Sequence, residues 1–498
     1  MAAGTDLYVT RGEDGAVRIT AGPGPSPGPS SGSPADNGGD PLGPDPSPSP
    51  GPGPGPGSGF TEAVLDVAGA VLLWPVLGDP VLPVAEVDDV ERAQQWLWAV
   101  YGERAAAAVR SCAGGQGAGD TTGEAAGDTV AGPAPARVTG DGTALADAAA
   151  RLAFGHWASR WWPASYADGI PALEPDVLGL ELAALTHRCQ ELFDDRGDQP
   201  DDCVAELIGD HQAALDPLVR WWRSEPRSGH IARHLESVLR LIDGAADAAG
   251  LDGPELRRLR AELDADQDAD QDADQDADLD ADQTVDQDQD QDQDADRTAP
   301  APLTPGALFA SRLGYTLAAG EPLPVGGRVI ARGTGTNDWR RYPPGFVDAA
   351  ESAVSWTARA LGGRRRIEVE VVAHIAAPVC GAPLVAEVRV NGGLPVRAPL
   401  TRRDDVWTGR ADLEPGLSAG ELTPRFEVAV LLPGFDPGPG PEGHADREAV
   451  RALVRDRLVS AAARPVEGTA PYDASARATP SAPFLAEIVA ATTTGEDY

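Results

Sequence analysis

Four side chains that could bind a zinc ion lie close together in the sequence. His187, Cys189, Cys203 and His211 fall within 25 residues, and imidazole and thiolate groups are the usual ligands of tetrahedral zinc. Their spacing does not match a compact zinc knuckle, and both Cys189 and His211 fall on the apolar faces of predicted helices. We therefore interpret Cys189 and His211 as core residues, and keep a metal site at Cys189, Cys203 and His211 as the alternative.

A second pair of histidines has the spacing that zinc metallopeptidases use. His230 and His234 are four residues apart and share one face of a predicted helix, but Ile231 stands where such an enzyme needs a glutamate base. His234 also falls on the apolar stripe of that helix, which favours a packing role. An enzyme or metal-dependent hydrolase built from His211, His230, His234 and Cys189 is the alternative function.

An acidic repeat spans residues 264–296. It contains sixteen aspartates at nearly every second position, and no glycine or glutamate, both of which an EF-hand calcium loop requires. Such a tract repels itself and cannot bury a core. It is predicted to be a solvated spacer, with weak divalent-ion association as the alternative.

Two stretches combine tryptophan with arginine, a composition enriched at protein interfaces. Trp161 and Trp162 follow Arg160, and a polar and aromatic run precedes the rigid turn Pro343-Pro344-Gly345. Bundle packing and bracing of a sheet are the competing interpretations. The predicted interaction surface consists of Trp161, Trp162, Asn337, Asp338, Trp339, Arg340, Arg341 and Tyr342.

Composition excludes several other kinds of chemistry. The chain has no lysine, which Walker-type phosphate loops, kinases and Schiff-base enzymes all need. RGTGT lacks the third glycine of a dinucleotide fingerprint, and no G-x-S-x-G motif occurs. The net charge of −38 opposes attraction to nucleic acid or an anionic membrane. We expect no catalytic residue, no cofactor, no nucleic-acid partner and no membrane contact.

Periodicity and composition divide the chain into packed and soft segments, and predict an α+β multidomain protein. A small β element and a mostly helical bundle precede an antiparallel β-sandwich-like domain with a closing helix, and disordered low-complexity segments separate them. The boundaries are 1–21 and 59–112 (β/α part), 22–58 (Pro/Gly/Ser linker), 113–142 (Gly/Ala linker), 143–263 (bundle, packing with 59–112), 264–300 (acidic repeat), 301–465 (β-rich domain with its helix) and 466–498 (loose tail).

Particular elements follow from local patterns. A hairpin is predicted around GEDG, and a helix after Asp88 with Glu91 completing a capping box. A helix from Val204 to Trp222 should bend or break at Pro217. Period-two stretches from SAVSWTARA onwards predict an antiparallel meander, and Asp446 could cap the closing helix.

The stretches HWASRWWPASYADGIPALEPDVL (156–178) and TNDWRRYPPGFVDAAESAVSW (336–356) resemble segments of uncharacterised proteins of high-GC actinobacteria. The resemblance implies a bacterial host and a cytoplasmic setting, and brings no activity or catalytic residue with it. The absence of a basic and apolar leader at the N-terminus also favours the cytoplasm. From the sequence we expect a non-enzymatic adaptor or accessory protein that binds an unknown protein partner.

Overall fold

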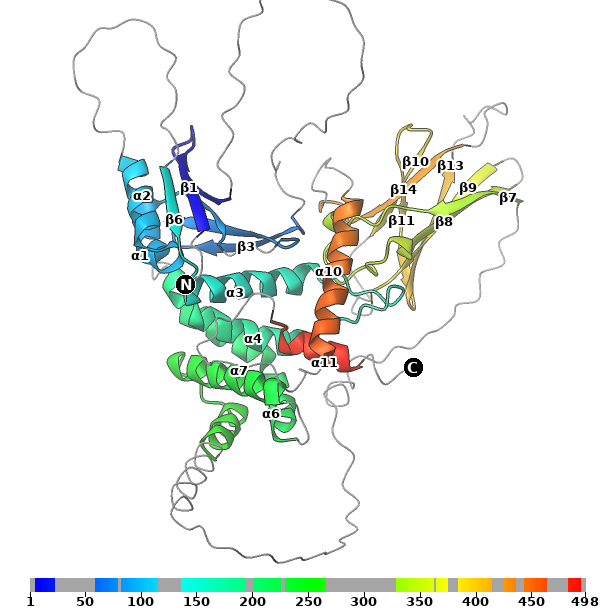
Figure 1. Ribbon diagram of the computed structural model, residues 1–498. Helices are drawn as coiled ribbons and strands as arrows, with labels where there is room; N and C mark the ends of the chain where they lie inside the picture. The colour runs from blue at the N-terminus through cyan, green and yellow to red at the C-terminus, as the bar shows by residue number, and fades with distance from the viewer. Residues whose placement is uncertain are drawn as a thin grey trace, which may run out of the picture. The chain divides into compact units, whose positions relative to one another are not determined.

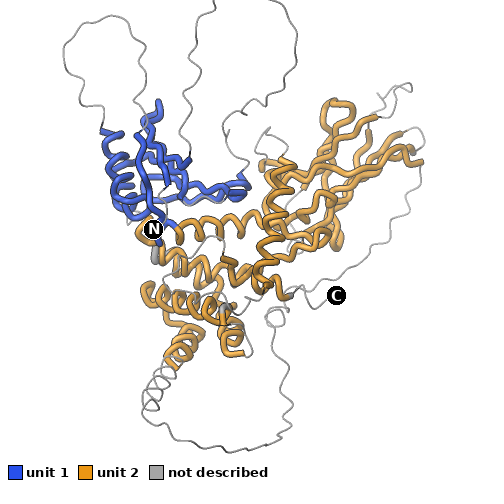
Figure 2. The backbone as a smooth tube through the Cα atoms, viewed as in Figure 1, with its two compact units in different colours: residues 1–146 blue, residues 147–498 orange. Residues whose placement is uncertain are grey.

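The computed structural model divides into two compact units, Met1–Ala146 and Asp147–Tyr498 (Figure 2). The structure describes residues 5–22, 59–78, 82–114, 136–193, 200–224, 229–265, 328–361, 364–374, 384–413, 424–435, 443–463 and 482–493.

The first unit contains a six-stranded antiparallel sheet. Its strands are β1 (Thr5–Arg11), β2 (Val17–Ala21), β3 (Glu62–Val67), β4 (Ala70–Pro75), β5 (Val84–Val87) and β6 (Ala136–Gly140), in the order β3-β4-β5-β2-β1-β6. The predicted hairpin is confirmed, because β1 pairs with β2 from Leu7 opposite Ala21 to Arg11 opposite Val17. Alternate residues of β2, β3 and β4 are buried, as a sheet with one covered face requires.

Two helices, α1 (Val90–Tyr101) and α2 (Glu103–Gly114), complete the first unit. The predicted amphipathic helix is confirmed, and it buries Ala93, Trp96, Leu97, Val100 and Tyr101. Its cap is Asp89 and not Asp88. The Asp89 carboxylate accepts from the backbone N–H groups of Glu91 and Arg92, each at 3.1 Å, which satisfies donors that a helix start leaves unpaired.

Strand β6 corrects the prediction of a linker throughout residues 113–142. Thr5 to Val9 of β1 lie opposite Gly140 to Ala136, so the sequence ARVTG closes one edge of the sheet. A Cβ atom at Gly140 would lie 2.5 Å from a methyl carbon of Leu7, so a larger residue there would force the Leu7 side chain to move. The surrounding Gly- and Ala-rich composition concealed this short strand.

The second unit begins with helices: α3 (Ala144–Trp161, which starts at the end of the first unit), α4 (Pro175–Arg188), α5 (Pro200–His211), α6 (Leu215–Arg223), α7 (Gly229–Ala248) and a helix at 254–265, with short 3-10 turns η1 (Gln190–Leu192) and η2 (Gln212–Ala214). The expected interruption near Pro217 is confirmed but lies earlier, at η2. Pro217 falls in the first turn of α6, where its missing N–H has no partner to lose.

Two antiparallel sheets follow, so the α+β class is confirmed. Their strands are β7 (Arg328–Thr334), β8 (Val354–Leu361), β9 (Arg364–Val372), β10 (Val385–Val390), β11 (Val396–Pro399), β12 (Thr401–Arg403), β13 (Val406–Leu413) and β14 (Phe426–Leu431). Five strands pair in the order β12-β13-β9-β8-β7, and three in the order β11-β10-β14. Between β7 and β8 lie two 3-10 turns, η4 (Trp339–Arg341) and η5 (Glu351–Ala353).

Two C-terminal helices, α10 (His444–Ala462) and α11 (Leu485–Thr493), complete the second unit (Figure 1). The predicted closing helix is α10, whose cap residue is Gly443 and not Asp446. Helix α11 corrects the prediction of a loose tail at 466–498. Its apolar residues are buried, among them Leu485, Ile488 and Val489, so this short run belongs to the core.

Buried carboxylates join α11 to α10 and to α4, and α4 lies far from α11 in the sequence. The Glu487 carboxylate is fully buried and accepts from Nε and Nη2 of Arg457 on α10, at 2.7 and 2.8 Å. Glu181 on α4 accepts from Arg151 on α3 at 2.5 Å and from the backbone N–H of Leu485 at 2.8 Å. Segments on both sides of the acidic repeat therefore share one core.

Two aromatic rings lie among these arginines. The rings of Phe154 and Phe484 stack with their centroids 6.2 Å apart, and each has a guanidinium carbon 4.5 Å from its centroid: Arg457 for Phe154 and Arg151 for Phe484. Cation–π attraction is stronger where the cation is desolvated, as it is here. The helices of residues 147–265 and the C-terminal elements thus belong to one compact unit.

In the part of the chain that the structure describes, no helix is both long and apolar enough to cross a bilayer.

Removing the charge of Glu487 should destabilise the second unit strongly. Glu487→Gln leaves the buried Arg457 guanidinium without a counter-charge, and breaking such a pair costs about 3–5 kcal/mol. The measurement is the free energy of unfolding in urea, followed by tryptophan fluorescence. The matched control is Glu236→Gln, whose partner Arg240 lies 2.8 Å away on a partly exposed helix face and should matter by less than about 1 kcal/mol. Equal effects of the two changes would contradict a structural role for the buried pair.

Candidate functional site

The loop that joins β7 to η5 is held by a buried asparagine. The Asn337 side chain is fully buried, and its Nδ2 donates to the carbonyl oxygens of Asp348 at 2.9 Å and Ala350 at 2.7 Å. Its Oδ1 accepts from the hydroxyl of Tyr342. Both polar atoms of the Asn337 amide are therefore bonded within the loop. These bonds fix the course of the loop, because a buried polar group without a partner is costly.

Asp338 organises the next turn. Its carboxylate accepts from the backbone N–H of Arg340 at 3.2 Å, which caps η4, and from the Arg340 guanidinium at 3.0 and 2.6 Å. Asp338 is itself only 6% exposed. The Arg340 guanidinium is therefore bonded within the loop. The side chains of Trp339 and Tyr342 are buried.

Asp348 connects this loop to the segment that follows α3. Its Oδ1 accepts from the hydroxyl of Ser165 at 2.7 Å and from the N–H of Ala350 at 2.9 Å, and its Oδ2 accepts from the N–H of Tyr166 at 2.8 Å. The residues that meet here are separated by more than 180 positions in sequence. One carboxylate thus brings together the two tryptophan-rich stretches.

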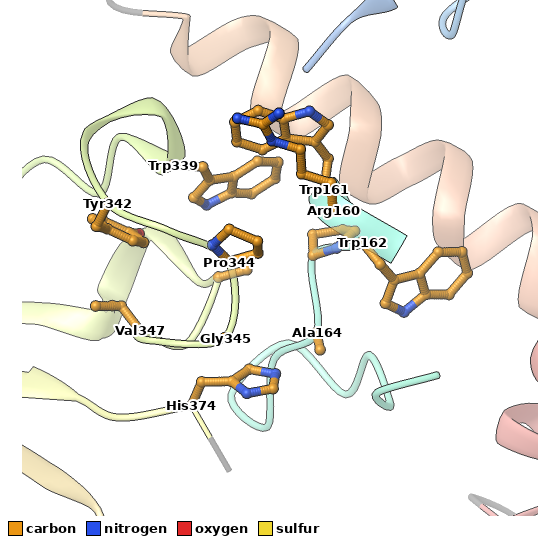
Figure 3. Close-up of a pocket in the computed structure, with 12 residues that line it drawn as sticks. Arg160, Trp161, Trp162, Ala164, Trp339, Tyr342, Pro344, Gly345, Val347 and His374 are labelled. Atoms are coloured by element: carbon orange, nitrogen blue, oxygen red, sulfur yellow. The ribbon is translucent and has the colours of Figure 1, made fainter. Parts of the chain in front are cut away.

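A small cavity of about 40 Å³ lies where these two segments meet (Figure 3). Its walls include Trp161, Trp162, Trp339, Tyr342, Pro344 and His374. Trp339 and Tyr342 are buried, whereas Trp161 and Trp162 are half-buried at the end of α3. Since one water needs roughly 10–15 Å³ by this measure, the cavity could hold a few waters or one small apolar group. We call it the aromatic pocket.

One cation stands at the edge of the aromatic pocket. Arg160 is exposed, and its guanidinium carbon lies 5.0 Å from the ring centroid of Trp161. Trp162 is fixed by its indole N–H, which donates to the carbonyl oxygen of Pro171 at 2.9 Å. The pocket therefore offers aromatic faces with a guanidinium beside them.

Burial favours the uncharged forms of two titratable groups in the aromatic pocket, His374 and Tyr342. Burial lowers the pKa of His374 because it disfavours the imidazolium, although the nearby Asp348 charge acts in the opposite direction. Burial also raises the pKa of Tyr342 well above its usual value. The neutral imidazole and phenol add little charge to the walls of the pocket.

The eight predicted interaction residues have different surroundings. Four of them, Trp161, Trp162, Trp339 and Tyr342, meet in the aromatic pocket. Asn337 and Asp338 are buried braces, Arg340 pairs with Asp338, and Arg341 lies 4.0 Å from Glu387. Burial of Asn337 and Asp338 means that they act by positioning the loop and offer no surface to a partner.

Sequence reasoning missed three residues of this site. Asp348 and Ser165 lie within the stretches already singled out, but nothing in the sequence indicated that they bond to each other. His374 follows β9, and only the fold brings it to the pocket. The sequence offered one signal for Asp348: it is a charged residue between the apolar residues Val347 and Ala349.

The three residues of the alternative metal site, Cys189, Cys203 and His211, differ in burial and in their contacts. Cys189 is fully buried, and burial raises the pKa of its thiol to about 12, whereas Cys203 is exposed. The ring of His211 lies 3.1 Å from Asp176 and so close to Gly179 that a Cβ there would be 2.0 Å away. Within the described ranges, no three His, Cys, Asp or Glu side chains are grouped so that they could hold a metal ion.

The remaining histidine pair and the acidic repeat are only partly described. His234 lies 3.7 Å from the buried Glu181, which places it beside the core of the helices. The side chain of His230 lies outside the described residues, as does the acidic repeat beyond Ala265.

Comparison with family models, with characterised proteins and with solved structures gives no match.

Loss of the Asp348 carboxylate should open the aromatic pocket. Asp348→Ala removes three bonds to one charged group, and such bonds contribute about 1.5–3 kcal/mol each, so we expect a loss of about 3 kcal/mol or more in unfolding free energy. The emission of the pocket tryptophans should also shift to the red as water reaches them. The control is Asp412→Ala, which breaks an exposed pair with Arg366 at 2.8 Å and should cost less than about 1 kcal/mol. An unshifted spectrum for Asp348→Ala would refute the connecting role.

Proposed function

We propose that this protein is a non-enzymatic interaction or accessory protein, and that the aromatic pocket receives an apolar side chain of a protein partner. The observation that carries the proposal is the convergence of two tryptophan-rich segments, from the end of α3 and from η4, on one small cavity. Neither segment forms the cavity alone. A site assembled in this way from distant residues is typical of a binding surface on a rigid scaffold.

The chemistry of the pocket supports a protein partner. Tryptophan, tyrosine and arginine dominate the binding energy of protein interfaces, where they form desolvated pockets for a few anchoring side chains. The polar groups beneath the pocket, Asn337 and Asp348, are occupied by bonds within the protein. The half-buried Trp161 and the exposed Arg160 are what a partner would meet.

Several finer features belong to the same proposal. We propose that the helices of residues 147–265 form a bundle, and that the two sheets of residues 328–431 pack as a sandwich behind the pocket. The setting proposed is the cytoplasm of a high-GC actinobacterium. The strong negative charge of the chain supports a partner other than nucleic acid.

The test is co-purification of tagged full-length protein from a high-GC actinobacterial host, with pocket variants in parallel. Trp161→Ala and Arg160→Ala should each weaken the same near-stoichiometric association by about tenfold or more, as loss of an interface anchor does. Trp98→Ala is the matched control, because Trp98 is 54% exposed and belongs to the first unit. Circular dichroism verifies that each variant is folded.

Two results would overturn the proposed function. One is a protein that emerges alone, or whose partner is retained equally by the pocket variants and by Trp98→Ala. The other is stoichiometric zinc in the purified protein together with hydrolytic activity, which would favour the enzyme alternative built on His211, His230, His234 and Cys189.

A further inference from the structure

Three arginines surround one buried carboxylate on the three-stranded sheet. Glu387 on β10 is 6% exposed and lies 3.1 Å from Arg389, 3.4 Å from Arg397 and 4.0 Å from Arg341. The Arg389 and Arg397 side chains are 50% and 58% exposed, so they cover Glu387 and face solvent at the same time. We call these three arginines the arginine cluster.

The strand register explains why the cluster forms. Arg397 on β11 lies directly opposite Glu387, and Arg389 follows Glu387 by two positions and so shares its face. Arg341 belongs to η4. The backbone carbonyl oxygen of Arg341 accepts from the N–H of Leu432 at 2.8 Å, which holds η4 beside the end of β14. The position of each arginine is therefore set by backbone pairing.

Among the described residues on this face, arginines outnumber glutamates. The neighbouring groups are Arg425 and Glu427, 3.5 Å apart, with Glu427 opposite Arg389 in the register. Four arginines thus face two glutamates.

An excess of exposed guanidinium groups in a chain of net charge −38 points to a specific anionic ligand. Each exposed guanidinium of the cluster donates one bond to Glu387 and has further N–H groups that can bind carboxylates. We propose that the arginine cluster binds a carboxylate-rich peptide segment, and that its occupant is the aspartate repeat of this chain, residues 266–296.

Charge, spacing and reach support this occupant. Residues 266–296 contain fifteen aspartates at nearly every second position, which in an extended peptide places carboxylates roughly 7 Å apart on one side. Ala265 and Arg328, which flank residues 266–327, belong to the same compact unit as the cluster. A segment of that length reaches roughly 200 Å when extended. A tethered ligand acts at about millimolar effective concentration, so modest intrinsic affinity is sufficient.

This inference does not rest on the aromatic pocket. The pocket and the cluster share η4, but Trp339 lines the pocket and Arg341 lies beside Glu387. Trp161→Ala should therefore leave the binding of an acidic peptide unchanged, whatever becomes of the proposed function.

The experiment measures the fluorescence anisotropy of a labelled peptide with the sequence of residues 266–296, at low ionic strength. The receptor is the full-length chain in which those fifteen aspartates are replaced by asparagine, which we call the neutral-repeat variant. The unaltered protein should bind the probe at least about tenfold more weakly than the neutral-repeat variant, because its own repeat competes.

Three further variants are made in the neutral-repeat background. Arg389→Gln/Arg397→Gln should weaken probe binding by at least about tenfold, since two charge-assisted contacts are lost. Glu387→Gln should tighten it about threefold or more, because a competing anion is removed. That gain cannot result from misfolding. Arg332→Gln/Arg403→Gln changes the net charge equally on exposed positions of the five-stranded sheet and should stay within about twofold.

Specific results would overturn the proposal. They are equal loss in the cluster and control double variants, unchanged affinity in Glu387→Gln, or equal probe affinity of the unaltered and neutral-repeat proteins. A single-stranded oligonucleotide that displaces the probe more effectively than the unlabelled peptide does would also overturn it, in favour of a nucleic-acid ligand.

Discussion

Several carboxylates of the second unit, among them Glu181, Asp348 and Glu487, are buried and surrounded by donors, and the arrangement of the unit depends on this. A buried charge is tolerated only when it is paired and hydrogen-bonded, so each carboxylate fixes the groups around it. Glu487 fixes α10 against α11, Glu181 fixes α3 and α11 against α4, and Glu351 accepts from Arg447 on α10 at 2.6 Å. Helices and sheets that are distant in sequence are thereby held in one body.

The same requirement forms the functional surfaces. Asp348 can be buried only with the N–H and O–H groups of the segment after α3, and this contact brings Trp161 and Trp162 to Trp339. Glu387 is buried only beneath its arginines, which gathers positive charge on a strongly acidic protein. The aromatic pocket and the arginine cluster are thus two results of burying single carboxylates, and η4 contributes a residue to each.

Local sequence patterns predicted individual helices and strands better than they predicted which distant elements these contact. The hairpin at GEDG, the helix of Ala93 and Leu97, and the period-two strands could be read from the sequence because neighbouring residues determine them. Strand β6 and helix α11 could not, since each is a short run inside Gly- or Ala-rich sequence and is stabilised by distant contacts. The candidate tryptophans were found by composition, but their meeting at Asp348 depends on a bond across more than 180 residues. An arginine such as Arg447 resembles a surface residue in sequence and is buried by its ion pair.

Cleavage between residues 266 and 327 tests the central claim, that the helices before the acidic repeat and the sheets after it form one body. A site-specific protease sequence is placed in this segment of the full-length protein, and the cleaved product is passed over a size-exclusion column. If contacts that cross the cleavage site, such as those of Glu181 with the backbone N–H of Leu485 and of Asp348 with Ser165, hold the unit together, both fragments elute as one peak at the position of the uncleaved protein. Two separate peaks, each folded by circular dichroism, would contradict the claim.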